Sequence, residues 1–210
     1  MQQVFTLDEI MGMDKIPRIN FMNSISGFKS ANLIASIDDK GQPNVAIFSS
    51  VIHLGSKPPF FGFISRPASV DRHTLSNILA HKYYTINHIN TSNYIQAHQT
   101  SGKYAQGVNE FEKCHLEEAY VNDFKVPFVK SSKIKLAMKL VEKHHITAND
   151  TILVVGKLVF AVMHKNLMGD DGALSIENAN TLTISGINNY HETKKLASLP
   201  YVTTESIRKQ

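Results

Sequence analysis

Apolar residues occur along the chain in short runs, and residues that favour turns separate these runs at regular intervals. The runs at 31–37 and 44–53 flank Asp38-Asp39-Lys40-Gly41. This pattern predicts a β-hairpin, because Asp and Gly readily adopt the backbone angles of a tight turn. The prolines at 58 and 59 cannot donate to a strand ladder, so a third strand is expected after them, at 60–65. Further strands are expected at 83–88, 116–121, 134–141 and 151–164.

Helical periodicity is weaker and is confined to short segments. Apolar residues at helical spacing predict a helix over 71–81, for which Ser69 or Asp71 is the candidate N-cap. Two more short helices are expected at 91–99 and 109–113. Short strands with brief intervening helices favour an antiparallel barrel or sandwich over a repeated β-α-β sheet. From residue 166 onward Gly, Asn and Asp are frequent, which indicates loops and peripheral structure around a single domain.

The composition is typical of a soluble domain in a reducing compartment. The chain has 210 residues, of which 42% are hydrophobic and 19% charged, and it contains one cysteine, Cys114. A chain of this size can bury a substantial core without disulfides or a structural metal. Neither a signal peptide nor an apolar run long enough to span a membrane is recognisable. We therefore expect a cytoplasmic protein that does not associate with membranes.

The charge balance does not favour a nucleic-acid partner. The net charge is +4, and acidic residues are interspersed among the basic ones, which makes a weak field for a phosphate backbone. The segment 125–143 is an exception, because it contains six lysines and a single acidic residue, Glu142. We interpret this segment as a solvated strand face, and the alternative is a docking patch for an anionic partner.

Residues 66–74 carry the clearest chemical signal in the sequence. None of the ten histidines stands at a recognised metal-binding spacing, and no G-x-S-x-G, G-x-G-x-x-G or Walker motif occurs, so we expect neither a metal site nor a hydrolase. At 66–74, however, two of the four arginines, a histidine and two hydroxyl residues meet between a strand and a helix. Guanidinium groups and the free N–H groups of a helix N-terminus bind phosphate well. Ion pairing of the two arginines with Asp71, or contact with solvent, is the alternative.

A second candidate site is the strand segment 44–51, which alternates small and polar residues. Small side chains would let a flat group approach the backbone. An ordinary sheet strand whose serines face water is the alternative interpretation.

The order of short motifs along the chain resembles that of a known family. The motifs are 35–41, 44–51, Pro58-Pro59-Phe60, Arg66-Pro67, His73-Thr74, Asn77-Ile78, 84–88, 97–101, Asn109-Glu110-Phe111 and 152–156. On this ordered set the chain resembles the flavin reductase-like, FMN-binding split-barrel family. It departs from the best-known reductases of that family at 44–50, where they carry a T-x-N/S-x-F run, and at His73-Thr74, where many have Asp-Thr.

The resemblance implies a mostly β fold, a six-stranded antiparallel split β-barrel of Greek-key topology with short peripheral helices, which forms a homodimer. The barrel would span residues 20–190, between an N-terminal extension at 1–19 and a C-terminal tail at 191–210. FMN is the implied cofactor, in a groove at or near the subunit interface.

The resemblance also implies a set of site residues. Backbone groups of 46–51 would contact the polar edge of the flavin ring, the segment 66–74 would hold the phosphate, and Tyr190 would close the pocket. His98 is the candidate catalytic residue, as a contact for the nicotinamide. The implied cofactor-binding residues are Asn44, Ala46, Phe48, Ser49, Ser50, Val51, Arg66, Arg72, His73, Thr74, Asn87, Ser101 and Tyr190.

The implied reaction is hydride transfer from NADH or NADPH to the flavin and on to a small-molecule acceptor, with the protein binding and orienting the reactants. One alternative is an FMN-binding carrier, sensor or interaction module without nicotinamide-dependent turnover. A further alternative is an oxidase that acts on a phosphorylated pyridoxamine-type substrate.

Overall fold

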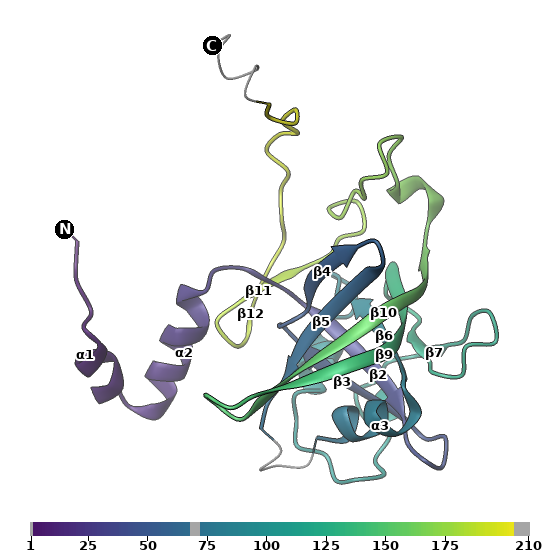
Figure 1. Ribbon diagram of the computed structural model, residues 1–210, viewed down its shortest axis with the longest axis horizontal. Helices are drawn as coiled ribbons and strands as arrows, with labels where there is room; N and C mark the ends of the chain where they lie inside the picture. The colour runs from purple at the N-terminus through teal and green to yellow at the C-terminus, as the bar shows by residue number, and fades with distance from the viewer. Residues whose placement is uncertain (1, 68–71, 204–210) are drawn as a thin grey trace.

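The computed structural model describes residues 2–67 and 72–203 (Figure 1). Its strands are β1 (Lys29–Ser30), β2 (Asn32–Ile37), β3 (Pro43–Phe48), β4 (Ile52–Ser56), β5 (Pro59–Ser65), β6 (Tyr83–His88), β7 (Glu118–Ala119), β8 (Phe128–Val129), β9 (Ile134–Ile146), β10 (Thr151–Met163), β11 (Thr183–Ser185) and β12 (Asn189–His191). Its helices are α1 (Leu7–Gly12), α2 (Lys15–Ile25), α3 (His73–His81), α4 (Tyr94–Gln99), α5 (Glu110–Lys113) and the 3₁₀ helix η1 (Lys165–Leu167).

An antiparallel sheet of seven strands forms the body of the molecule, in the order β3-β2-β6-β9-β10-β5-β4. The sheet curls so that its two edges approach each other (Figure 1). The Ser50 hydroxyl, just beyond β3, accepts the Ile64 N–H and donates to the Ile64 carbonyl of β5, both at 3.1 Å. Ser50 therefore joins the β3 edge to the opposite side of the sheet and helps to close the barrel.

The inner face of the curled sheet is apolar because alternate residues of each strand point inward. Ile34, Phe63, Tyr84, Ile86, Leu136, Met138 and Val154 form one buried cluster together with Leu75 and Ile78 of α3. Because α3 contributes two side chains to this cluster, its N-terminal turn is fixed against β2 and β3. The packing thus positions His73 and Thr74, the two residues of the predicted phosphate segment that belong to α3.

A second buried cluster covers the outer face of β2 and β3. Leu33, Ala35 and Val45 pack there against α4, α5 and the small sheet β1-β11-β12, through Ala97, Phe111, Cys114, Leu182 and Ile184. The edge strand β3 is consequently enclosed on both faces, by α3 on one and by α4 and α5 on the other.

The N-terminal helices lie apart from this body. Neither α1 nor α2 has a buried residue, and both lie to one side of the barrel (Figure 1). Thr6 and Glu9 form a capping box at the start of α1. No helix in the described part of the chain has both the length and the apolar character needed to cross a bilayer.

The mostly β, antiparallel character that the sequence predicts is confirmed, with differences in detail. The sheet has seven strands where the resemblance implied six, because the run at 44–53 is divided into β3 and β4 by the segment 49–51. The strand predicted at 116–121 is reduced to β7 and pairs with β8 outside this sheet. The C-terminal region, expected as loops, contributes β11 and β12, and α1 and α2 were not expected. The candidate caps Ser69 and Asp71 lie outside the described residues.

Candidate functional site

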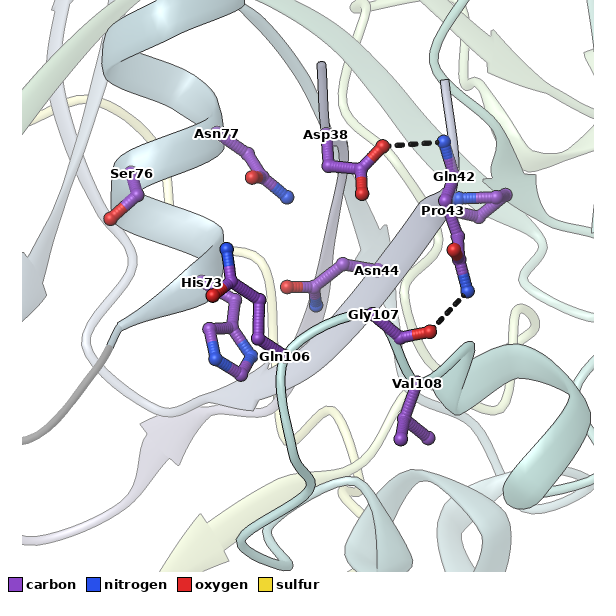
Figure 2. A pocket seen from close by; sticks show the side chains of 10 residues that line it. All are labelled: Asp38, Gln42, Pro43, Asn44, His73, Ser76, Asn77, Gln106, Gly107 and Val108. Carbon is purple, nitrogen blue, oxygen red and sulfur yellow. Dashed lines mark hydrogen bonds between the residues drawn. The ribbon is translucent and has the colours of Figure 1, made fainter. Parts of the chain in front are cut away.

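A cavity of about 100 Å³ lies between α3, the start of β3 and the loop at 106–108 (Figure 2). Two of the residues that the resemblance implies, Asn44 and His73, line it. Figure 2 shows the side chains of Asn44 and Asn77 pointing into the space between β3 and α3. The complete lining is Asp38, Gln42, Pro43, Asn44, His73, Ser76, Asn77, Gln106, Gly107 and Val108.

The side chain of Asn44 is held in this wall with an unused acceptor. Asn44 is 6% exposed, and its Oδ1 is buried with no hydrogen-bond partner among the described residues. The neighbouring Asn77 Nδ2 donates to Ser36 Oγ at 3.1 Å. A buried carbonyl oxygen without a donor is unfavourable by about 1–3 kcal/mol, so Asn44 is poised to accept a hydrogen bond from a ligand.

Donor groups gather at the N-terminus of α3. Arg72 is the N-cap residue of α3, and its side chain makes no capping hydrogen bond to the described first turn of the helix. The Arg72 Nε is buried without a partner among the residues described. His73 begins the helix and faces the cavity, and Thr74 is buried beside it. Partial positive charge at a helix N-terminus adds to these donors, so this end of the cavity favours an anion.

Two carboxylates border the site. Asp38 Oδ1 accepts the N–H groups of Lys40 and Gln42, both at 2.8 Å, which fixes the β2–β3 turn. Glu110 Oε2 accepts the N–H of Val45 at 3.4 Å. Burial raises the pKa of Glu110, and hydrogen bonds to backbone N–H groups together with the charge of nearby His73 act in the opposite direction. Both carboxylates thus have structural partners in the turn or in β3.

The register of β3 shows which of its backbone groups are free of the sheet. The Asp38 N–H bonds to the Gln42 carbonyl in the turn, and the pairing continues from there to Asn32 and Phe48. Because bonded and non-bonded pairs alternate in an antiparallel ladder, Ala46 and Phe48 bond to β2. The backbone groups of Val45 and Ile47 face the free edge, and the bond from Val45 to Glu110 agrees with this assignment.

The segment that follows β3 packs into the barrel. The Phe48 ring meets Phe63 edge-on at 5.0 Å between centroids. Val51 packs on the same inner cluster, and its carbonyl accepts the Ser30 hydroxyl at 3.2 Å. Ala46 and Ser49 are half-buried. The segment 44–51 is therefore packed against the barrel, and Ser50 bonds across the barrel to Ile64 instead of facing water.

His98 and Tyr190, which are 92 positions apart in the sequence, are brought into contact. His98 Nδ1 lies 3.1 Å from the Tyr190 hydroxyl, and the two rings meet edge-on. Burial raises the pKa of Tyr190 to about 12, so its hydroxyl keeps its proton at neutral pH. His98 is exposed at the end of α4, whereas Tyr190 is half-buried against the outer cluster.

Three other implied residues lie in different settings. Asn87 is fully buried, donates to the Leu33 carbonyl and to Thr85 Oγ1, and accepts the Val129 N–H. These bonds give Asn87 a structural role, and we do not include it in the site. Arg66, after β5, and Ser101, after α4, are both exposed, and neither lines the cavity.

The cavity also contains residues that sequence reasoning did not single out. Gln42, Ser76 and Gln106 line it, together with the backbone at 107 and 108. The Gln42 Nε2 donates to the Gly107 carbonyl at 2.6 Å, which ties the loop to the β2–β3 hairpin (Figure 2). Polar residues in loops give no local signal of such a contact, because it depends on packing between segments 65 positions apart.

Comparisons with known proteins agree with this architecture. Residues 26–179 match the family model described as the flavin reductase like domain. None of the curated proteins is similar enough to the chain to count as a match. A solved structure from Shewanella frigidimarina NCIMB 400, reported as that of a candidate flavin reductase with a split barrel domain, is 44% identical. It covers 96% of this chain and 100% of its own, with a TM-score of 0.92.

More distant solved structures share the fold. Nitrilotriacetate monooxygenase component B from Bacillus cereus is 16% identical, covers 95% of this chain and 99% of its own, and has a TM-score of 0.82. Flavoredoxin of Desulfovibrio vulgaris (Miyazaki F) is 15% identical, covers 95% of this chain and 98% of its own, and has a TM-score of 0.73.

Proposed function

The chain belongs to the flavin reductase-like family, and from that premise we propose that it is an oxidoreductase that binds FMN. In this proposal the enzyme transfers a hydride from NADH or NADPH to the flavin and on to a small-molecule acceptor. One observation carries the proposal: around the N-terminus of α3 a buried donor, Arg72 Nε, and a buried acceptor, Asn44 Oδ1, have no hydrogen-bond partner among residues 2–67 and 72–203.

Arg72 Nε and Asn44 Oδ1 would suit the ribityl phosphate of FMN. The phosphate is an acceptor for a guanidinium and for helix N–H groups, and the ribityl hydroxyls can donate to an amide oxygen. Arg72, His73 and Thr74 would hold the phosphate, with Arg66 reaching in from the end of β5. Asn44 would accept a ribityl hydroxyl from the wall of the cavity.

The edge of β3 fits the polar side of a flat ring. The backbone of Ile47 faces the free edge of the sheet, whereas Ala46 and Phe48 bond to β2. Within β3 we therefore assign the Ile47 peptide groups to reading the ring, together with the backbone of 49–51, which lies beyond the paired part of the strand. Phe48 and Ser50 would support this wall through their contacts with Phe63 and Ile64.

When bound, FMN supplies the hydride chemistry, and the protein binds, orients and shields the reactants. We assign His98 to contact with the nicotinamide. The Tyr190 hydroxyl would hold the imidazole ring of His98 in place through the bond at Nδ1. Neither role requires a strong acid or base.

We also propose that the protein acts as a homodimer in the cytoplasm. Strands β4 and β10 expose Ile52, Leu54 and Val159, and the N-terminal helices expose several more large apolar side chains. Exposed apolar patches of this kind mark interaction surfaces, and burial against a second copy would remove these side chains from water.

Equilibrium titration with FMN, followed by flavin fluorescence, tests the site. Arg72→Leu should weaken binding about 10- to 150-fold, the range for a hydrogen bond to a charged group. His73→Gln should weaken it in the same direction, and His144→Gln, at an exposed position of β9, is the matched control. Equal FMN affinity in all four proteins would refute the placement of the phosphate.

The activity has a separate test, which is the oxidation of NADH or NADPH by the FMN-loaded protein. Turnover with either nicotinamide supports the oxidoreductase. Tight FMN binding without turnover would instead support a flavin carrier or sensor.

A further inference from the structure

A second cavity, of about 300 Å³, lies where the turn before β9 meets the end of β10. This volume is at the lower end of the range for small-molecule pockets. No lining residue is shared with the first cavity. The lining consists of Lys130, Ser131, Ser132, Lys133, Lys135, Val162, Met163 and His164.

The charged side chains that line this cavity, among the described residues, are all basic. Three lysines and a histidine line it, and none of the described lining residues is acidic. Lys130 bonds to Glu117 at 2.5 Å, which offsets one of these charges. Lys133 and Lys135 take part in none of the ion pairs found within residues 2–67 and 72–203.

Lys133 and Lys135 are not fully solvated. Both are half-buried, and burial lowers the pKa of Lys135. An ammonium group that is partly removed from water without a counter-ion is unfavourable. The lysine-rich segment predicted as a solvated strand face is therefore divided, because Lys125, Lys139 and Lys143 are exposed whereas Lys133 and Lys135 border a cavity.

The two serines add further donors. Asn93 Nδ2 donates to Ser131 Oγ at 3.0 Å and to Ser132 Oγ at 3.4 Å. Because each hydroxyl oxygen accepts a bond from this amide, its own proton is left to donate elsewhere. Asn93 is itself held in place, since its Oδ1 accepts the Asn90 N–H at 2.9 Å. Ser132 is 2% exposed and still lines the cavity, and it is the more buried of the two serines.

From this arrangement we propose that the second cavity binds a small oxyanion of the phosphate class, held by Lys133, Lys135 and the hydroxyls of Ser131 and Ser132. Two ammonium groups and two hydroxyl groups would donate hydrogen bonds to the ligand. Hydrogen bonds between an ammonium group and an oxyanion are stronger than those between neutral groups. The site is independent of the flavin site. Its ligand is either free phosphate or pyrophosphate, or the phosphate group of a larger metabolite.

Calorimetric titration of the full chain with phosphate, pyrophosphate and adenosine monophosphate, at constant ionic strength in chloride, tests the proposal. We expect saturable binding of at least one of the three. Tighter binding of the nucleotide would identify a phosphorylated metabolite as the source, and tighter binding of the inorganic ions would identify a free oxyanion. Absence of saturable binding by all three would overturn the proposal.

A residue-level readout separates this site from the N-terminus of α3, which also favours anions. An amine-reactive reagent is applied with and without pyrophosphate, and each lysine is quantified by mass spectrometry. Lys133 and Lys135 should be protected, while Lys139 and Lys143 of the same strand should react unchanged. Equal protection of all four lysines, or of none, would contradict the assignment.

Two double variants with the same loss of charge complete the test. Lys133→Gln with Lys135→Gln should weaken pyrophosphate binding at least about tenfold, whereas Lys139→Gln with Lys143→Gln should bind as the unchanged protein does. Equal weakening in both would show a general effect of net charge and would refute the site. If the first double variant does not fold, the protection pattern of the unchanged protein decides the question.

Discussion

Gly156 on β10 lies against a buried tyrosine, and adding one methyl group there should measurably destabilise the barrel. A Cβ at this position would overlap the Tyr84 hydroxyl and would lie 2.9 Å from Cζ and 3.2 Å from Cε1. Tyr84 is 0% exposed and meets the Phe63 ring edge-on at 5.8 Å, so it cannot move without disturbing the inner cluster.

The expected loss follows from two opposed effects. Overpacking of a dense core destabilises by about 1–3 kcal/mol, and replacing Gly by Ala restores about 0.4–1 kcal/mol by restricting the unfolded chain. Because the overlap with the buried Tyr84 hydroxyl is severe, overpacking should lie at the upper end of its range, and Gly156→Ala should lower the free energy of unfolding by about 2–2.6 kcal/mol. Urea denaturation measures this change as a shift of the midpoint at constant slope.

Tyr84→Phe provides the internal check. The Tyr84 hydroxyl has no hydrogen-bond partner among the described residues, so its removal alone should be nearly neutral. In the double variant the overlap with the hydroxyl is gone while the 2.9 Å contact with Cζ remains, so part of the loss caused by Gly156→Ala should be recovered. Gly55→Ala on β4, whose Cβ would meet only a carbonyl oxygen at 3.6 Å, is the matched control and should cost nothing. The reasoning fails if Gly156→Ala is as stable as the unchanged protein, or if Tyr84→Phe recovers none of the loss.

Three further predictions concern single side chains. Burial lowers the pKa of His88 to about 4, so the unfolded chain binds a proton below about pH 6.5 that the folded chain does not. The contribution of neutral His88 to the free energy of unfolding should be fully present above that pH. It should fall by on the order of 3 kcal/mol towards pH 4. Urea unfolding measured between about pH 6.5 and pH 4 should show that the free energy of unfolding of His88→Asn falls less steeply with decreasing pH than that of the unchanged protein. The same pH dependence in both proteins would contradict the lowered pKa of His88. Asn87→Ala should lower the free energy of unfolding by about 1–3 kcal/mol, because it leaves the buried Val129 N–H without an acceptor; denaturant unfolding measures the loss, and unaltered stability would argue against a structural Asn87. Tyr190→Phe removes the bond to His98 and keeps the ring that is implied to close the FMN pocket, so it should raise the KM for the nicotinamide severalfold and change the FMN affinity much less; steady-state kinetics and FMN titration separate the two, and an unchanged KM would count against the role of His98.

Strands could be predicted from the sequence where the local pattern of apolar residues matches the way the strand packs in the sheet. The predicted strand at 83–88 coincides with β6, and the hairpin turn at 38–41 is confirmed by the Asp38 bonds to the Lys40 and Gln42 N–H groups. β9 extends to Ile146, beyond the predicted end at 141, because its exposed second half is held by pairing with β10. A capping box at Thr6 and Glu9 was present in the sequence as a signal for α1.

The candidate site was predictable only in part. The resemblance implied Asn44 and His73, and both line the first cavity. The loop at 106–108 could not be assigned to that cavity from sequence, because its position depends on the long-range bond from Gln42 to Gly107. The same reasoning explains Asn87, whose bonds to Leu33 and Val129 become visible only when β2, β6 and β8 are assembled.

Anaerobic addition of NADH, and then NADPH, to the protein saturated with FMN tests the proposed function most directly. The visible absorption band of the bound flavin is followed, with free FMN at the same concentration as the control. The account predicts that one nicotinamide bleaches the band in proportion to the amount added, and faster than in the control. A protein that takes up no FMN, or bound flavin that neither nicotinamide bleaches, would contradict it.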